Sequence, residues 1–195
     1  MGPEEGKTST SVNLAVTIAR SGYSVLLVDA DLRKPRIHTI FRLNNLSGLS
    51  TYLAGASPDI DTIFKRPLTN LSIIPSGPVP PNPSELLGSA RMHELIGGLS
   101  EKFDIIIWDS PPLMTVTDSL ILSKFFDGTI IVAKSGKTTY EIVGRGLKYL
   151  KGRRESDMES RVLGIVINAF DTKKSDQYFY QYYNYYPSSE EESKQ

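Results

Sequence analysis

The stretch that decides the fold is the first eight residues, Met1-Gly2-Pro3-Glu4-Glu5-Gly6-Lys7-Thr8. The closing Gly-Lys-Thr is typical of a phosphate-binding loop, in which backbone N–H groups and the N-terminus of the next helix face a polyphosphate. In such a loop the lysine reaches the β- and γ-phosphates, and the threonine hydroxyl can bind Mg²⁺. The full pattern has a glycine five residues before Gly6, where this chain has Met1, so the loop alone is an incomplete match.

The helix that should follow this loop is predicted over residues 9–20, where apolar residues recur on one face and Ser21-Gly22 ends the pattern. A phosphate-binding loop normally joins a buried strand to a helix. Nothing before Met1 could form that strand, so we expect that the central strand has been lost and that the polypeptide alone is unstable. The alternative is that another strand takes its place.

Composition excludes several classes of protein. A length of 195 residues suits one domain, and 22 basic residues balance 22 acidic ones, so nothing global indicates nucleic acid as a partner. The sequence has no cysteine, and its two histidines, His38 and His93, do not indicate a zinc site. It contains neither an apolar run of membrane-spanning length nor a signal peptide, which predicts a soluble polypeptide.

Acidic residues follow two predicted buried strands. Residues 24–29 (SVLLVD) are read as a continuous apolar run that leads into Asp29-Ala30-Asp31, and residues 103–108 (FDIIIW) are predicted as another buried strand, which leads into Asp109. Open α/β sheets bind ligands at the carboxyl ends of their strands. We therefore interpret the first two acids as groups that orient a metal and take a proton, and Asp109 as a second arm for Mg²⁺. The alternative for Asp29-x-Asp31 is a turn or a helix cap.

The remaining chain alternates between strands and helices. Further strands are predicted over residues 71–75, 128–133 and 161–168, and further helices over 47–55, 83–99, 118–125 and 138–150. This alternation predicts an α/β, P-loop NTPase-like fold: a doubly wound, mostly parallel sheet with helices on both faces, lacking the strand before the loop. The proline-rich residues 76–83 predict a rigid loop, either a substrate-positioning element or a plain connector.

The character of the chain changes at Asp171. We expect residues 1–170 to form the catalytic domain and residues 171–195 to form a flexible tail, because no regular period would bury its aromatic residues. Beside a nucleotide site, such a tail is interpreted as a substrate carried on the enzyme. The candidate phosphate acceptors are the clustered tyrosines Tyr178, Tyr180, Tyr182, Tyr183, Tyr185 and Tyr186.

Five stretches, which together span nearly the whole chain, resemble one family: the bacterial tyrosine kinases of capsule and exopolysaccharide export, within the deviant Walker P-loop ATPases. They are Pro3-x-x-Gly6-Lys7-Thr8, VDADLRKP at 28–35, SGPVPPNPSELL at 76–87, DSPP at 109–112 and the terminal tyrosine cluster. The second, third and fifth are the more specific.

The resemblance implies an ATP- and Mg²⁺-dependent protein-tyrosine kinase that phosphorylates its own tail in trans. Lys7 would contact the phosphates, Asp29 would take the tyrosine proton, and Asp31 and Asp109 would support the metal together with Thr8. These four charged residues are the expected catalytic groups. The expected nucleotide-binding residues are Gly2, Pro3, Glu4, Glu5, Gly6, Lys7, Thr8, Ser9 and, near the adenine, Asn168.

The resemblance also implies partners and a location. These are other copies of the chain in a ring, a transmembrane chain-length regulator, a protein tyrosine phosphatase, and the cytoplasmic face of the plasma membrane, reached through a membrane partner or an upstream domain. One departure from the family is Glu4, where relatives commonly have glycine. We expect this carboxylate to weaken ATP binding without abolishing it, because it lies near the phosphates and resists a positive φ.

Two alternative functions remain open on sequence alone. The first is a positioning ATPase, but such proteins carry an extra lysine early in the loop and have no tyrosine tail, whereas residues 2–5 here contain no lysine. The second is a catalytically impaired scaffold whose tail is phosphorylated by a homologue. The lost strand and Glu4 favour that interpretation, while the retained Lys7, Asp29, Asp31 and Asp109 oppose it.

Overall fold

The computed structural model describes residues 2, 4–57, 59–151 and 161–171, and the tyrosine cluster, Met1 and Pro3 lie outside these ranges. The helices are α1 (Lys7–Arg20), α2 (Ile37–Ile40), α3 (Leu49–Leu53), the 3-10 helix η1 (Ile60–Ile63), α4 (Pro83–Leu87), α5 (Ala90–Ser100), α6 (Asp118–Ser123) and α7 (Tyr140–Leu150). The strands are β1 (Val25–Asp29), β2 (Lys65–Leu68), β3 (Leu71–Ile74), β4 (Ile105–Asp109), β5 (Thr129–Lys134) and β6 (Val162–Asn168).

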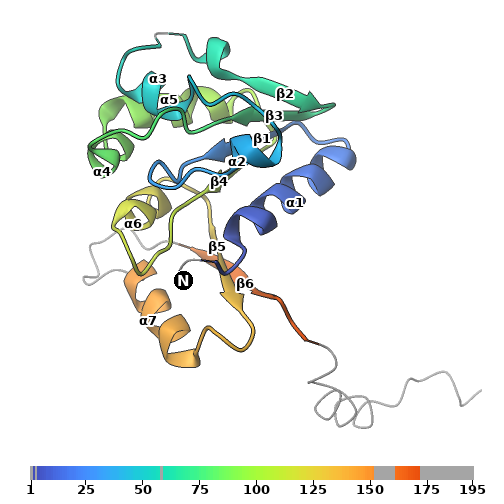
Figure 1. Ribbon diagram of the computed structural model, residues 1–195, viewed down its shortest axis with the longest axis vertical. Helices are drawn as coiled ribbons and strands as arrows, with labels where there is room; N and C mark the ends of the chain where they lie inside the picture. Colours follow the sequence, from blue (N-terminus) through green and yellow to red (C-terminus); the bar gives the residue numbers. More distant parts are fainter. Residues whose placement is uncertain (1, 3, 58, 152–160, 172–195) are drawn as a thin grey trace, which may run out of the picture.

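Within the described residues the strands form two sheets. The larger has the order β2-β3-β1-β4, and β5 pairs with β6 in the smaller one. Strand β1 is parallel to both β3 and β4, and β5 is parallel to β6. Among the strands of the described residues, only the β2–β3 pair is antiparallel. Figure 1 shows the larger sheet in the upper half of the molecule and the β5–β6 pair with α7 in the lower half. The predicted α/β fold with a mostly parallel sheet is confirmed.

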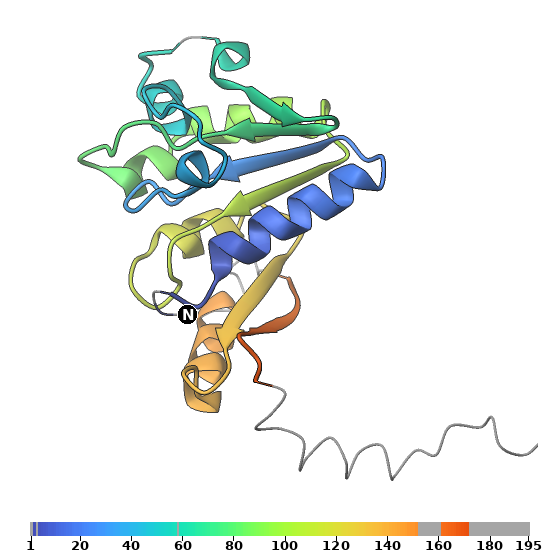
Figure 2. The same cartoon turned by 45° about the vertical axis from the view of Figure 1, so that its right-hand side comes forward.

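Strand β1 buries both of its faces, as its uninterrupted apolar sequence predicts. Leu26 and Val28 belong to a core cluster with residues of α3, α4, α5 and α6, whereas Val25 and Leu27 pack with residues of α1 and α2. Because successive side chains of a strand point to opposite faces, this division shows that helices cover both sides of the sheet. Figure 2 shows α1 running along one of these sides.

Two local predictions differ from the structure. The helix expected over 83–99 is two helices, because Gly88 ends α4 and Ser89 caps α5, its Oγ accepting a hydrogen bond from the Met92 N–H at 3.3 Å. Strand β2 was not predicted, since its sequence Lys-Arg-Pro-Leu has no apolar run. It lies at the edge of the sheet, the position in which a strand tolerates proline.

A groove of about 300 Å³ separates the two sheets. Its walls are the facing edges of β4 and β5, with Leu14 and Ile18 of α1 on one side and Leu122 and Phe126 on the other. Trp108 also lines it, stacked on Phe126 with ring centroids 4.9 Å apart. Within the described residues no strand pairs with β4 and β5 across this groove. The sheet is therefore divided between β4 and β5, where the strand expected before the phosphate-binding loop would lie.

We expect a strand added before Gly2 to stabilise the protein, because it could fill the groove between β4 and β5. We expect a five- or six-residue Val/Ile segment fused there to raise Tm by roughly 5–10 °C, because it would pair with β4 and β5 and bury apolar surface with a net contribution of about 2–3 kcal/mol. The measurement is thermal unfolding followed by circular dichroism. A Gly/Ser segment of equal length is the control, and an equal Tm for both fusions would contradict the prediction.

Candidate active site

The loop at the start of α1 has the backbone that phosphate binding requires. Gly6, immediately before α1, has φ 89°, in the left-handed region that favours glycine. A Cβ atom added there would also collide with the Asn168 amide. Asn168, the last residue of β6, donates a hydrogen bond from Nδ2 to the Glu5 carbonyl oxygen at 2.9 Å. Asn168 thus lies against the loop, and its contact with the nucleotide stays a prediction.

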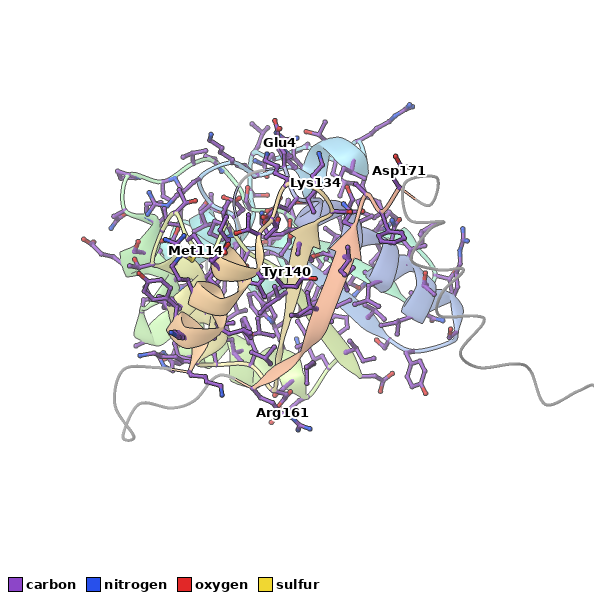
Figure 3. All side chains as sticks on the ribbon, turned by 90° about the horizontal axis from the view of Figure 1, so that it is seen from below. Glu4, Met114, Lys134, Tyr140, Arg161 and Asp171 are labelled. Atoms are coloured by element: carbon purple, nitrogen blue, oxygen red, sulfur yellow. The ribbon has the colours of Figure 1, made fainter. Side chains whose placement is uncertain are left out.

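A second contact holds the loop from the β5 side. The Thr138 hydroxyl donates to Glu5 Oε1 at 2.7 Å and accepts from the Lys134 N–H at 3.0 Å. Figure 3 shows Glu4 and Lys134 at the same end of the molecule, with Arg161, just before β6, at the opposite end. The buried Glu5 side chain therefore ties the loop to the turn between β5 and α7. Sequence reasoning missed Thr138, because its spacing from the loop carries no motif.

The register of β1 on β4 brings the predicted acids together. Asp29 and Asp109 are paired residues of these neighbouring parallel strands, and the Ala30 N–H donates to the Asp109 carbonyl oxygen at 2.8 Å. Asp109 also meets α1, since Ser11 Oγ donates to its Oδ1 at 3.2 Å and the Thr8 hydroxyl bonds to the same carboxylate. Thr8 and Asp109, predicted to share a metal, are thus in contact. Ser11 was not predicted.

The two acids after β1 are held by the backbone that follows them. Asp29 Oδ2 accepts from the N–H groups of Arg36 and Ile37 at 3.1 and 3.0 Å. Asp31 Oδ1 accepts from those of Arg33 and Lys34 at 3.2 and 2.9 Å. Asp29 is fully buried, and its Oδ1 has no hydrogen-bond partner within the described residues. A buried oxygen without a partner is costly, so this atom is a candidate acceptor for a ligand hydroxyl.

Crowding of carboxylates in a buried site changes their protonation. Burial raises the pKa of Asp29 to about 7, with Asp109 and Asp31 adding to the rise and the N–H groups of Ile37 and Arg36 opposing it. Burial likewise raises the pKa of Asp109 to about 6, against the hydrogen bonds from Thr8 and Ser11. A carboxyl with a pKa near neutrality can exchange a proton with substrate at physiological pH.

Lys7 lies at the mouth of the loop, where its Nζ donates to the Gly2 carbonyl oxygen at 3.0 Å. Burial lowers the pKa of Lys7, while the charges of Asp109 and Asp31 oppose this change. Lys7 therefore forms one cluster with Asp31 and Asp109, the two acids predicted to bind the metal. Ser9, in the first turn of α1, is exposed.

The donor set fits Mg²⁺ delivered with a nucleotide. Among the described residues, no three acidic or histidine side chains converge closely enough to hold a metal by themselves. Mg²⁺ usually binds proteins through one or two carboxylates and completes its shell with phosphate oxygens and water. The Thr8 hydroxyl and the Asp31 and Asp109 carboxylates supply oxygen ligands of this kind, and the partnerless Asp29 oxygen stays open for a hydroxyl.

Comparison with known proteins places the chain in a family. Residues 5–155 match the model of an AAA domain. The chain is 39% identical over 178 residues to the tyrosine-protein kinase YwqD of Bacillus subtilis, covering 91% of this chain and 73% of that protein. The chain belongs to the bacterial tyrosine-protein kinases. The putative tyrosine-protein kinase CapB of Staphylococcus aureus is 36% identical, with 91% and 75% covered.

Solved structures agree with this placement. The chimerical protein CapA2B2 superposes with a TM-score of 0.80 at 35% identity, covering 87% of this chain and 73% of that one. The kinase domain of the Escherichia coli tyrosine kinase ETK also gives 0.80, at 33% identity, with 86% and 64% covered. The fold is that of P-loop ATPases, which bind nucleotide, typically with Mg²⁺.

The positioning-ATPase interpretation is not favoured. The Pyrococcus furiosus cell division ATPase MinD superposes with a TM-score of 0.71, but its 24% identity shows a shared fold alone. Relatives that are 36–39% identical to the chain are named as tyrosine-protein kinases. In the part of the chain that the structure describes, no helix has the length and apolarity needed to cross a membrane.

We expect substitution of Glu4 by glycine to raise the affinity for nucleotide. Glu4 has φ 63°, the left-handed conformation that glycine adopts without strain, so the expected backbone conflict is present. We expect Glu4→Gly to tighten ATP binding about three- to tenfold, because it removes both this strain and a negative charge beside the phosphates. Isothermal titration calorimetry measures the effect. Glu4→Gln, which removes only the charge, separates the two causes, and unchanged affinity in both variants would refute the idea.

Because the pKa of Asp29 is raised, we expect the free energy of unfolding to depend on pH. Because the folded-state pKa of Asp29, about 7, exceeds the ordinary value, the contribution of this residue to stability is complete below the unfolded-state pKa and is lost as pH rises through about 7. We expect Asp29→Asn to stabilise the nucleotide-free protein by about 1–3 kcal/mol at a pH of about 8 and to have little effect at a pH of about 4.

Urea unfolding at both pH values tests this, with the exposed Glu101→Gln as the control. A stability gain from Asp29→Asn that is the same at both pH values would show that the Asp29 charge is not its cause.

Proposed function

We propose that this chain is an ATP- and Mg²⁺-dependent protein-tyrosine kinase that phosphorylates the tyrosine cluster of its own C-terminal tail in trans. The observation that carries the proposal is the pairing of Asp29 with Asp109 beside the loop, with one buried Asp29 oxygen left without a partner among the described residues. Water and a tyrosine hydroxyl both lose a proton when they attack the phosphate, and membership of the tyrosine-protein kinases favours tyrosine as the acceptor. A carboxylate that is fixed at one oxygen and open at the other suits an acceptor hydroxyl that must lose a proton.

Each residue of the site has a role in this reaction. Lys7 and the N–H groups of the loop bind and orient the phosphates, and Asn168 holds the loop from β6. Thr8, Asp31 and Asp109 would bind Mg²⁺, which when present neutralises charge that develops on the transferred phosphoryl group. Asp29 Oδ1 accepts the proton of the acceptor tyrosine, whose ordinary pKa is near 10.

The acceptors are Tyr178, Tyr180, Tyr182, Tyr183, Tyr185 and Tyr186, which lie outside the described residues. The nearest described strand is β6, which ends at Asn168 beside the loop. The chain therefore leaves β6 at the nucleotide end of the sheet. This exit places the start of the tail at the end of the sheet where the phosphates would bind, and phosphorylation in trans rests on the family membership.

The same family membership supports the proposed partners and setting. These are a ring of identical chains, a transmembrane chain-length regulator of capsule or exopolysaccharide export, and a protein tyrosine phosphatase that resets the tail. The location that fits them is the cytoplasmic face of the plasma membrane. The scaffold alternative is weakened because Lys7, Asp31 and Asp109 interact within one cluster rather than lying dispersed.

The test is intact mass spectrometry after incubation with ATP and Mg²⁺. It uses the chain as it stands and a version extended before Gly2 by a strand and a helix. We expect the extended chain to gain phosphate, and fragmentation to place it within residues 178–186. The extended Lys7→Met variant should gain none, because the loop then lacks its phosphate-binding cation.

A variant with all six clustered tyrosines changed to phenylalanine is the matched control for the acceptor. A folded, extended chain that hydrolyses ATP without gaining mass would refute the kinase and favour a positioning ATPase. A chain that does neither would favour the scaffold.

A further inference from the structure

A buried ion pair lies beside the candidate site but outside the phosphate-binding loop. Asp118, the first residue of α6, is fully buried. The Arg33 guanidinium donates to it in a bidentate manner, from Nε to Oδ2 at 2.8 Å and from Nη2 to Oδ1 at 3.1 Å. Ser84 donates from Oγ to Oδ1 at 2.6 Å and also lies 3.1 Å from Arg33 Nη2. Paired guanidinium and carboxylate planes fix geometry as well as charge.

The three residues come from segments that are distant in sequence. Arg33 belongs to the turn after β1, Ser84 lies in α4 directly after the proline-rich loop, and Asp118 begins α6. Because Asp118 is anchored in the core next to Leu122, it offers a rigid attachment point for an otherwise exposed turn. The Arg33 side chain itself remains 39% exposed, so its position depends on this attachment rather than on burial.

The turn that Arg33 anchors also orients the catalytic acids. The backbone N–H groups of Arg33 and Lys34 donate to one oxygen of Asp31, and those of Arg36 and Ile37 donate to one oxygen of Asp29. In each carboxylate the other oxygen receives no bond from this turn. A rotation of the turn would therefore move both acids, and it is the Arg33 side chain that ties the turn to α6.

We propose that Arg33 is a positioning residue for the catalytic acids. Asp118 and Ser84 bind its guanidinium, and this fixes the turn whose N–H groups orient the metal-binding Asp31 and the proton acceptor Asp29. The inference rests on the proposed function, because it takes the magnesium–nucleotide site as given. Groups that orient metal ligands typically change metal affinity 10–100-fold when they are altered. Arg33 should therefore act on the magnesium-dependent part of nucleotide binding and not on the contacts of the loop with phosphate.

Removal of Arg33 alone is ambiguous, because it leaves a buried carboxylate without its cation and destabilises the fold. The double variant Arg33→Met/Asp118→Asn removes both charges, and the new amide can still accept the Ser84 hydrogen bond. The measured quantity is the ratio of ADP affinity with Mg²⁺ to that with EDTA, from titration calorimetry, beside Tm. We expect the double variant to keep a Tm close to that of the wild type and its EDTA affinity, while the magnesium enhancement falls about tenfold.

Matched variants complete the test. Arg66→Met removes an exposed arginine on the edge strand β2 and should leave the enhancement unchanged, whereas Asp31→Asn should abolish it. Arg33→Lys keeps the charge pair but cannot form the fork, so it should lower the enhancement by less than the double variant does. If the double variant fails to fold, Arg33→Lys and Ser84→Ala carry the test, because both keep Asp118 paired with a cation.

The outcomes separate the two proposals. Suppose that Mg²⁺ raises the ADP affinity of the wild type, and that this enhancement is unchanged in the double variant and in Arg33→Lys. This result would overturn the role of Arg33 and leave the proposed magnesium site standing. A wild type whose ADP affinity does not depend on Mg²⁺ would overturn the magnesium site and, with it, the role of Arg33. A lowered enhancement in the double variant at preserved Tm supports positioning, because a merely structural role would be relieved by neutralising both charges.

Discussion

The parallel pairing of β1 with β4 is the constraint on which the site depends. It sets Asp29 directly beside Asp109 on neighbouring strands, at the end of a sheet whose other residues are largely apolar and buried. Burial is the main reason why both pKa values lie well above the ordinary range. Repulsion from Asp109 and Asp31 adds to the rise for Asp29, and repulsion from Asp31 adds to it for Asp109. Burying two ionised carboxylates costs free energy unless a cation or a shared proton compensates their charge. The site therefore favours the binding of a cation or a proton.

The surrounding elements hold this electrostatic pair without neutralising it. The loop is fixed from two sides, by Asn168 of β6 and by Thr138 after β5. The acids are oriented by backbone N–H groups, which hold single oxygens and leave others open for a ligand. Positioning by N–H groups and by Arg33 bound to Asp118 suits phosphoryl transfer, since that reaction asks a protein mainly for geometry and charge.

No described strand lies between β4 and β5, yet the acid pair and the contacts of the loop are both formed. Strand β1 retains both of its neighbours, so the acid pair is intact. Strands β5 and β6 are joined to the loop through Asn168 and Thr138, rather than through a ladder to β4. The nucleotide end of the site is thus held by side-chain contacts between the loop and the β5–β6 pair.

The sequence alone determined the loop, the acids at the ends of two apolar strands, and the doubly wound α/β class, because glycine, lysine and strand-end carboxylates have local signatures. It overstated the burial of β4, in which residues 105–108 are only partly buried. It also led to the family through its motifs. It did not reveal the break at Gly88 and Ser89, the edge strand with Pro67, or the contacts of Ser11 and Thr138. From the sequence, Asp118 indicated only a helix start, and Arg33 only part of a motif. Tertiary structure decided their partnership, because a bond between residues 85 positions apart depends on how helices pack on the sheet, which no local pattern records.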